Sequence, residues 1–534
     1  MMKQRKYFEI YASVGRKCVP DKDMPYKVGT LLSDMKYARI HGAAIVSNTA
    51  ENFSFIYGNQ EAISLAKGNE RLVSIAAVPT TALIESGDSK YYDYLLDQGV
   101  RAFKVLHQEK YYPSLDPGSM SAIAETLITH KRPLMIAGIS SKEIYHQVGQ
   151  LAGAYPELPI IMQGTSWYYG RSFLDVMERY TNLHFEISSN HMNSILEVTR
   201  KHFGIERVLF GTEWPNKSMG ALKCLVEYAD LTEEEKDLVA HGNACRLLGL
   251  SMDDFQLYDD TECEFDEIAR QADAGLSISV PVIDSHTHMV AKEDKTTHYV
   301  MPDSDCDAIA EKMERLGIDT IITAPWSGIS FDGRKGNADA LYAAQKYPGK
   351  FLAYSTCNIH YDEDLKVWQK YHTEYPDIFV GIKPYWPFQK FNLMTEACEE
   401  WFAYANEHHL LLLLHTGGSD AILDQADQLS LKYPNITLIL AHSGINYSVA
   451  RKNAALARKR DNVVLEITYT SVMRGMIEFL VSEVGADKVL YGSDMPMRDP
   501  APQLGWVCYA KIPLEDKKKL LAGNIQRLLK NCIT

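Results

Sequence analysis

Two histidines stand two residues apart in the segment VIDSHTHMV, at positions His286 and His288. Residues two apart in an extended strand point to the same face, so both imidazoles leave one side of this segment. That arrangement can seat one cation. The pair alone is weak evidence, because a short histidine motif also arises by chance and a lone histidine is commonly a hydrogen-bonded core residue.

Three further apolar runs end in a residue that can also bind a metal ion. His415 ends LLLLLH, His442 ends ITLILAH and Asp494 ends VLYGSD. Parallel strands of a barrel bring their carboxyl ends to one face, so these side chains should meet. Imidazoles with one carboxylate suit Zn²⁺ with an open position for water. The five positions together therefore predict a metal site.

The second half of the chain contains short β-branched and leucine-rich runs separated by stretches of helical period. Eight such runs lie at 281–285, 319–324, 351–356, 378–383, 410–415, 436–442, 462–467 and 488–494. Strands that alternate with helices in this way indicate a closed parallel barrel covered by helices. The barrel would present all of the candidate ligands at one end.

The first half repeats this order. Its runs lie at 7–13, 42–48, 71–77, 99–104, 133–137, 158–163, 183–188 and 207–213. Lys104 and Lys383 are 279 residues apart, and Glu213 and Asp494 are 281 apart. Near-constant offsets indicate a tandem duplication. We therefore expect an α/β protein of two tandem TIM barrels, residues 1–250 and 280–534, joined by an acidic linker over 251–279.

The ordered motifs of the second half resemble the amidohydrolase superfamily. They are DSHTH, GIKPYW, LLHTGG, LAHSG and YGSDMP, and the last two resemble its amidohydrolase-related branch. The resemblance implies a TIM barrel with a divalent metal, usually zinc. It also implies hydrolysis of a small amide, lactone or ester, or alternatively non-oxidative decarboxylation of a small carboxylic acid.

Carried over residue by residue, the resemblance makes His286, His288, His415 and Asp494 the metal ligands. His442 would orient the attacking water or polarise the substrate. Asp494 would also take up a proton and pass it to the leaving group. In a decarboxylase the same residues would bind the carboxylate and handle the proton that replaces CO₂.

Lys383 has three possible roles. In two-metal members of the superfamily a lysine on the fourth strand is carbamylated and bridges the ions. Alternatively, Lys383 binds a substrate anion or forms an ion pair at the end of the barrel. Because the first half keeps Lys104 at the matching position, we expect one divalent ion per chain, Zn²⁺, and a substrate-binding role for Lys383. Trp326 and Trp386 follow strand ends and are candidates for lining the pocket.

The first half lacks the ligand set. Tyr11 and Ser13 replace the paired histidines, and Ala137, Gln163 and Glu213 fall opposite His415, His442 and Asp494. These residue types cannot hold zinc in this arrangement. The first barrel is therefore expected to be a degenerate copy lacking metal ligands, and a metal-free activity that uses Lys104, Gln163 and Glu213 is left open.

Composition narrows the classes of function. The formal net charge is −14, and no lysine-rich tail provides an electrostatic surface for nucleic acid. No apolar run reaches membrane-spanning length. The cysteines are scattered, which indicates reduced thiols and favours a cytoplasmic protein. We expect a small-molecule substrate and leave open a homo-oligomer. A non-catalytic pair of barrels for binding or scaffolding is the remaining alternative, and it leaves the ligands of the second half unexplained.

Overall fold

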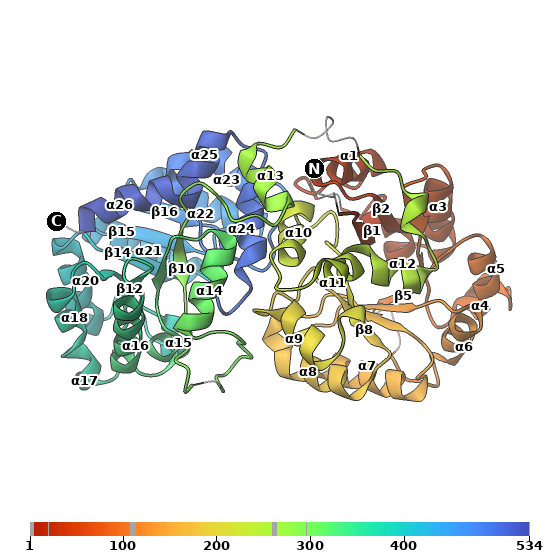
Figure 1. Cartoon of the computed structure of the whole chain (residues 1–534), viewed down its shortest axis with the longest axis horizontal. Helices are drawn as coiled ribbons and strands as arrows, with labels where there is room; N and C mark the ends of the chain where they lie inside the picture. Colours follow the sequence, from red (N-terminus) through yellow and green to blue (C-terminus); the bar gives the residue numbers. More distant parts are fainter. Residues whose placement is uncertain (1–4, 20, 107–113, 259–263, 295, 533–534) are drawn as a thin grey trace. The chain divides into compact units, whose positions relative to one another are not determined.

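A computed structural model describes residues 5–19, 21–106, 114–258, 264–294 and 296–532. The chain divides into two compact units. The first comprises Met1–Glu264 with His298–Val300, and the second comprises Phe265–Thr297 with Met301–Thr534. Figure 1 draws the first unit from red to yellow-green and the second mainly from green to blue.

The second unit is built on one parallel sheet, and its eight described strands follow one another in sequence order. The strands are β10 (Ile283–Thr287), β11 (Thr320–Thr323), β12 (Phe351–Ser355), β13 (Phe379–Ile382), β14 (Leu411–His415), β15 (Thr437–Ala441), β16 (Val463–Glu466) and β17 (Val489–Leu490). The Ser285 N–H donates to the Tyr491 carbonyl at 3.1 Å, and the Asp494 N–H donates to the His286 carbonyl at 2.8 Å. These bonds join the first strand to the last and close a barrel, as the sequence predicts.

Helices of the second unit surround this barrel (Figure 1). They are α13 (Glu267–Asp273), α14 (Cys306–Leu316), α15 (Trp326–Ser330), α16 (Gly333–Lys346), α17 (Asp362–Leu365), α18 (Trp368–Glu374), α19 (Trp386–Gln389), α20 (Glu399–Glu407), α21 (Asp420–Lys432), α22 (Tyr447–Lys459), α23 (Met476–Val484), α24 (Pro500–Cys508), α25 (Leu514–Lys518) and α26 (Asn524–Cys532).

Helix α14 illustrates why these segments are helical. The Asp305 carboxylate caps its first turn by accepting from two backbone N–H groups, and Gly317 ends it with a left-handed φ of 78°. Its buried side chains include Ile309, Met313 and Leu316, which recur at helical spacing on one face. Strand β14 behaves differently, because both faces of a barrel strand are covered: all four of its leucines are fully buried.

The first unit repeats the barrel order. Its strands are β1 (Phe8–Val14), β2 (Gly42–Ser47), β3 (Leu72–Ser74), β4 (Ala76–Ala77), β5 (Phe103–Leu106), β6 (Leu134–Ala137), β7 (Ile160–Met162), β8 (Leu183–Glu186) and β9 (Val208–Leu209). Only Ile75 separates β3 from β4, so these two segments form one barrel strand. The Ile10 N–H donates to the Phe210 carbonyl at 3.2 Å, and the Ser13 N–H donates to the Trp214 carbonyl at 2.8 Å. The expected α/β fold with two TIM-type barrels is therefore confirmed.

The helices of the first unit are α1 (Val28–Ala38), α2 (Asn48–Asn52), α3 (Phe55–Lys67), α4 (Ala82–Ser86), α5 (Tyr91–Asp97), α6 (Ser121–His130), α7 (Lys142–Ala154), α8 (Gly170–Arg179), α9 (Ile195–His202), α10 (Met219–Glu227), α11 (Glu233–Asp237) and α12 (Asn243–Leu248). Within the expected linker, residues 259–263 lie outside the described residues. Among the described helices, none is both long and apolar enough to cross a membrane.

Each unit ties its last helix to the last strand through an asparagine. In the second unit, the buried Asn524 Nδ2 donates to the carbonyls of Ala486 at 2.7 Å and Val489 at 2.9 Å. In the first, Asn243 Nδ2 donates to the carbonyls of Ile205 at 3.0 Å and Val208 at 2.9 Å. A glycine precedes the asparagine in both units, as Gly242-Asn243 and Gly523-Asn524, and the asparagine of this repeated pair therefore has a structural role.

The Asn524→Ala substitution should lower the free energy of unfolding by about 2 kcal/mol, because two buried hydrogen bonds worth roughly 1 kcal/mol each are lost. Urea unfolding followed by circular dichroism measures the change. Gln526→Ala, an exposed position on the same helix, is the control. Equal midpoints for the two variants would contradict the role assigned to Asn524.

Candidate metal centre

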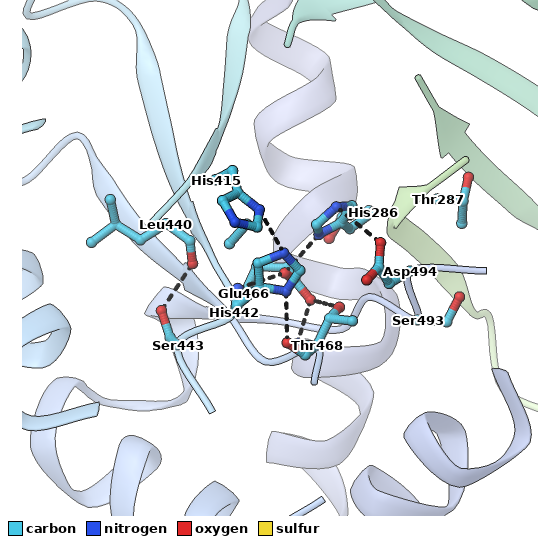
Figure 2. A network of polar contacts seen from close by, with 12 residues as sticks. His286, Thr287, His415, Leu440, His442, Ser443, Glu466, Thr468, Ser493 and Asp494 are labelled. Carbon is cyan, nitrogen blue, oxygen red and sulfur yellow. Dashed lines mark hydrogen bonds and ion pairs between the residues drawn. The ribbon is translucent and has the colours of Figure 1, made fainter. Parts of the chain in front are cut away.

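The paired histidines of β10 lie beside the aspartate that follows β17. The Nε2 atoms of His286 and His288 are 3.6 Å and 3.0 Å from Asp494 Oδ1. All three side chains are at most 4% exposed. Each offers a ligand atom, and these atoms lie within 4.8 Å of one another, which is compatible with a shared metal ion. Figure 2 shows His286 and Asp494 turned toward each other.

The far nitrogens of the histidines are hydrogen-bonded in a way that suits metal ligation. His286 Nδ1 lies 2.9 Å from Glu466 Oε2, and His288 Nδ1 lies 2.7 Å from the Ala324 carbonyl. A carbonyl can only accept, so His288 carries a proton on Nδ1, which is the arrangement that turns Nε2 toward a metal ion. Such outer hydrogen bonds fix the tautomer and the ring orientation of a ligating histidine. The residues present therefore fit a divalent cation.

His415 and His442 complete a compact cluster of imidazoles. His442 Nε2 is 3.1 Å from His415 Nδ1, and the ring centroids of His286 and His442 are 5.0 Å apart. Figure 2 shows these three rings together at the ends of their strands. Burial lowers the pKa of His286 and His415 well below the usual range and lowers the pKa of His442 to about 3. The rings are therefore neutral, as metal ligands must be.

Asp494 is held ionised by a residue that the sequence analysis missed. Burial opposes its ionisation, but Arg498, which pairs with Oδ2, outweighs burial and holds the pKa well below its usual range. Arg498 follows Asp494 by four residues, and this spacing was the only signal for it in the sequence. Asp494 and His442 also have left-handed φ values of 63° and 65°, an unfavourable conformation for residues with a Cβ that often marks functional sites.

Glu466 organises the cluster and was also missed as a site residue. Besides facing His286 Nδ1, its carboxylate accepts from the backbone N–H of His442 at 3.2 Å and of Thr468 at 2.6 Å. The space beside it is tight, because a Cβ built on Gly492 would lie 2.4 Å from Glu466 Oε1. The only sequence signal for Glu466 is that Glu186 lies 280 residues before it, an offset between those of the other repeated positions.

The remaining expected residues border the same cluster. Lys383 Nζ, 1% exposed, lies 3.1 Å from His286 Nε2, and burial lowers its pKa to about 8. Trp386 Nε1 donates to the His415 carbonyl at 2.7 Å. The Trp326 ring centroid is 6.3 Å from that of His288. All eight residues singled out from the sequence thus lie in one region of the second unit.

Matching hydrogen bonds within the two units show which of their residues correspond. The Tyr11 N–H donates to Glu9 just as the His286 N–H donates to Asp284, each at 3.1 Å. Ser13 corresponds to His288. The Ser13 N–H donates to the Trp214 carbonyl, and the His288 N–H donates to the Met495 carbonyl. The expected loss of both histidines at this end of the first barrel follows from these pairings.

One pairing from the sequence was wrong. The Gly164 N–H donates to Glu186 at 2.9 Å, as the His442 N–H donates to Glu466, and Gly164 also has a left-handed φ of 74°. Gly164, not Gln163, therefore corresponds to His442. Pairing residues by a nearly constant number of residues between the two repeats cannot detect a shift of one residue at the end of a short strand.

Comparisons with known proteins agree with this geometry. A family model described as Amidohydrolase matches residues 62–250 and 283–530. A search of curated proteins gave no match.

The chain is also similar to solved structures, each covering 47% of it. An uncharacterised TIM-barrel protein from Bordetella bronchiseptica is 17% identical, with a TM-score of 0.38 over 99% of its own chain. A dihydroxybenzoic acid decarboxylase from a Polaromonas species, with bound manganese and 2-nitroresorcinol, is 17% identical, with a TM-score of 0.39 over 97%. A 2,6-dihydroxybenzoate decarboxylase from Rhizobium is 17% identical, with a TM-score of 0.37 over 99%.

The Glu466→Gln substitution should weaken binding of a divalent metal by about 10- to 100-fold, because an amide cannot both accept from His286 and keep its backbone hydrogen bonds. Titration of metal-depleted protein with Zn²⁺ against a chelator measures the affinity. Glu186→Gln is the matched control, since Glu186 makes comparable bonds to Gly164 and Ser188 in the unit that lacks the candidate metal-binding histidines. Equal Zn²⁺ affinities for the two variants would refute the role of Glu466.

Proposed function

The chain belongs to the amidohydrolase family, and from that premise we propose that its second unit is a metal-dependent hydrolase of a small amide, lactone or ester. The observation that carries this proposal is the convergence of His286, His288 and Asp494 with their ligand atoms facing one another. Imidazoles and an ionised carboxylate form a donor set that suits Zn²⁺ with an open position for water.

We propose that His286, His288, His415 and Asp494 hold one Zn²⁺ ion. When bound, such an ion supplies Lewis-acid activation of water and of a substrate carbonyl. The His286 and His288 rings are already oriented by Glu466 and the Ala324 carbonyl. The chain therefore provides a preorganised site.

His442 is suited to orient the attacking water. Its Nδ1 lies 2.9 Å from the Thr468 carbonyl, which can only accept, so the proton resides on Nδ1 and Nε2 is an acceptor. Its pKa of about 3, a consequence of burial, keeps the ring neutral at physiological pH. In this structure Nε2 faces His415 Nδ1 at 3.1 Å. A water molecule that takes the place of this contact can donate to the acceptor nitrogen, whereas polarising a carbonyl would need a proton on that nitrogen. Of the two roles expected for His442, orientation of water fits its tautomer.

Asp494 is suited to move the proton. Its Oδ1 faces the two histidines and its Oδ2 is held by Arg498. This pairing keeps the carboxylate ionised and fixes its direction. We propose that it accepts a proton from the attacking water and passes it to the leaving nitrogen or oxygen. A carboxylate with a low pKa releases that proton readily, so it is not trapped on the enzyme.

Substrate recognition is assigned to Lys383, Trp326 and Trp386. Lys383 provides a buried amine next to His286 that can donate to a substrate oxygen. The Trp386 ring is anchored to the His415 carbonyl, and the Trp326 ring packs edge-on to Phe388 with centroids 5.5 Å apart. Anchored aromatic rings form rigid apolar walls. They favour a substrate with a planar or apolar group beside the scissile bond.

The decisive experiment is a screen of the zinc-loaded protein against N-acyl compounds, lactones and aromatic carboxylates, with acid release and CO₂ release measured in parallel. Acid release that depends on the metal supports the hydrolase. CO₂ release without acid release would replace it with the decarboxylase, which uses the same residues. Neither product from any class of substrate would contradict both assignments.

The Asp494→Asn substitution should retain the fold and reduce kcat by about 100-fold or more, because an amide oxygen can approach the ion but cannot accept the proton. Steady-state kinetics at saturating Zn²⁺ measure the effect. Gln163→Ala, in the first unit, should leave kcat unchanged. A near-normal kcat for Asp494→Asn would show that Asp494 binds the metal without transferring the proton.

Elemental analysis should find one divalent ion per chain. His286, His442 and Glu466 form another group of potential ligands. The Glu466 carboxylate already faces His286 Nδ1 and accepts from the His442 backbone N–H, so this group is not expected to hold a second ion. Addition of bicarbonate during expression should not change the metal content, and Lys383→Gln should impair turnover without removing an ion. Two ions whose occupancy depends on bicarbonate and on Lys383 would favour a carbamylated lysine.

A further inference from the structure

The first unit has a cavity of about 530 Å³ at the carboxyl ends of its strands. Its lining includes Tyr11, Lys17, Glu51, Lys104, Gln163 and Glu213. Tyr11 is the one aromatic side chain in this lining, and the larger side chains are polar or charged. Two lysines and two glutamates balance in charge. Such a lining suits a polar ligand with little net charge.

The buried lysine of this cavity has partners that its counterpart in the second unit lacks. Lys104 is 2% exposed, and its Nζ lies 2.5 Å from Glu51 Oε1 and donates to the Tyr11 hydroxyl. Burial lowers the pKa of Lys104, but Glu51 and Tyr11 outweigh burial and raise it. The residue therefore remains an ammonium. Two of its three N–H groups are engaged by these partners, and the third is available to a ligand.

The partner Glu51 occupies a position that is apolar in the second unit. Helix α2 ends with the Phe53 N–H donating to the Thr49 carbonyl, and α15 ends with the Phe331 N–H donating to the Ser327 carbonyl. This match places Glu51 opposite Ile329. A merely eroded site would lose charged groups, whereas the cavity of the first unit has a buried ion pair where its counterpart has an isoleucine.

Two acceptors in the same cavity lack donors. Gln163 is 3% exposed, and its Oε1 has no hydrogen-bond partner among the described residues. The half-buried Glu213, held at a left-handed φ of 53°, forms no ion pair within 4.0 Å in the described part of the chain, and the buried Lys217 acts on it only at longer range. A buried carbonyl oxygen without a donor is unfavourable. A ligand that carries a cationic donor would satisfy both groups.

We propose that this cavity binds a small zwitterionic molecule that carries an ammonium and a carboxylate, without a metal ion. The ammonium donates to Gln163 Oε1 and Glu213, and the carboxylate accepts from Lys104 and Lys17. Zwitterions match the balanced charge of the lining, and the cavity volume accommodates an amino acid with bound water. Because this site lies in the first unit, it is separate from the proposed hydrolytic centre.

Isothermal titration of the zinc-loaded full chain tests the proposal. The probes are glycine, β-alanine and 4-aminobutyrate, which differ in the separation of their charges, together with butylamine, butyrate and glycerol. At least one zwitterion should bind, and each probe that lacks one or both charges should bind at least tenfold more weakly. Binding of none of the three zwitterions would overturn the proposal.

Substitutions locate the site. Glu213→Gln, which preserves shape and removes charge, should weaken the bound zwitterion at least tenfold, and so should Gln163→Leu. Asp494→Asn, in the second unit, is the control and should leave this affinity unchanged. Thermal unfolding of each variant checks the fold, and if Gln163→Leu is unstable, the isosteric Glu213→Gln decides.

Three results would refute the assignment. Zwitterion binding that survives Glu213→Gln would exclude the proposed ammonium site. Binding lost in Asp494→Asn would transfer the ligand to the second unit. Glycerol binding equal to that of the best zwitterion, and insensitive to Glu213→Gln, would indicate a polyol site that recognises hydroxyl groups without charge.

Discussion

The candidate metal centre depends on the carboxylate of Glu466, which is fully buried at the end of β16. Burial raises its pKa, because a charge in this environment has lost its hydration. Donors from three directions compensate: the Thr468 N–H, the His442 N–H and the ring of His286. One carboxylate thereby connects the first, sixth and seventh strands of the barrel. The orientation of His286 and the backbone position of His442 both depend on it.

The first unit has the same support without the same chemistry. Glu186 accepts from Gly164 and Ser188 much as Glu466 accepts from His442 and Thr468. The barrel therefore retains its buried carboxylate when the histidines are absent, which means that this glutamate also stabilises the backbone. Fold and chemistry are separable here, and the side chains at the strand ends determine what each barrel can bind.

The sequence predicted the barrels and the clustering of the candidate ligand residues because both follow from local patterns. Apolar strands that end in histidine or aspartate place those side chains at one face of a parallel barrel, so His286, His415 and Asp494 could be identified without coordinates. The contributions of Glu466 and Arg498 could not be predicted in this way. Their roles depend on which atom of a neighbouring side chain they face, and that depends on packing between distant segments. The mistaken pairing of Gln163 with His442 has a related origin, since one residue at a strand end changes the direction of every side chain that follows.

Lys104 and Lys383 illustrate how little the strand position itself determines. The two lysines occupy corresponding positions of the repeat: Lys104 lies in β5, and Lys383 directly follows β13. Both side chains are at most 2% exposed. Burial alone lowers the pKa of a lysine, and this effect prevails at Lys383. At Lys104 the opposite shift results from Glu51 and Tyr11, which stand where the second unit has Ile329 and His286. A carboxylate contributed by a short helix thus fixes one lysine as an ammonium. The other lysine, beside neutral imidazoles, has a pKa of about 8, close enough to neutral pH for its charge to respond to whatever binds next to it.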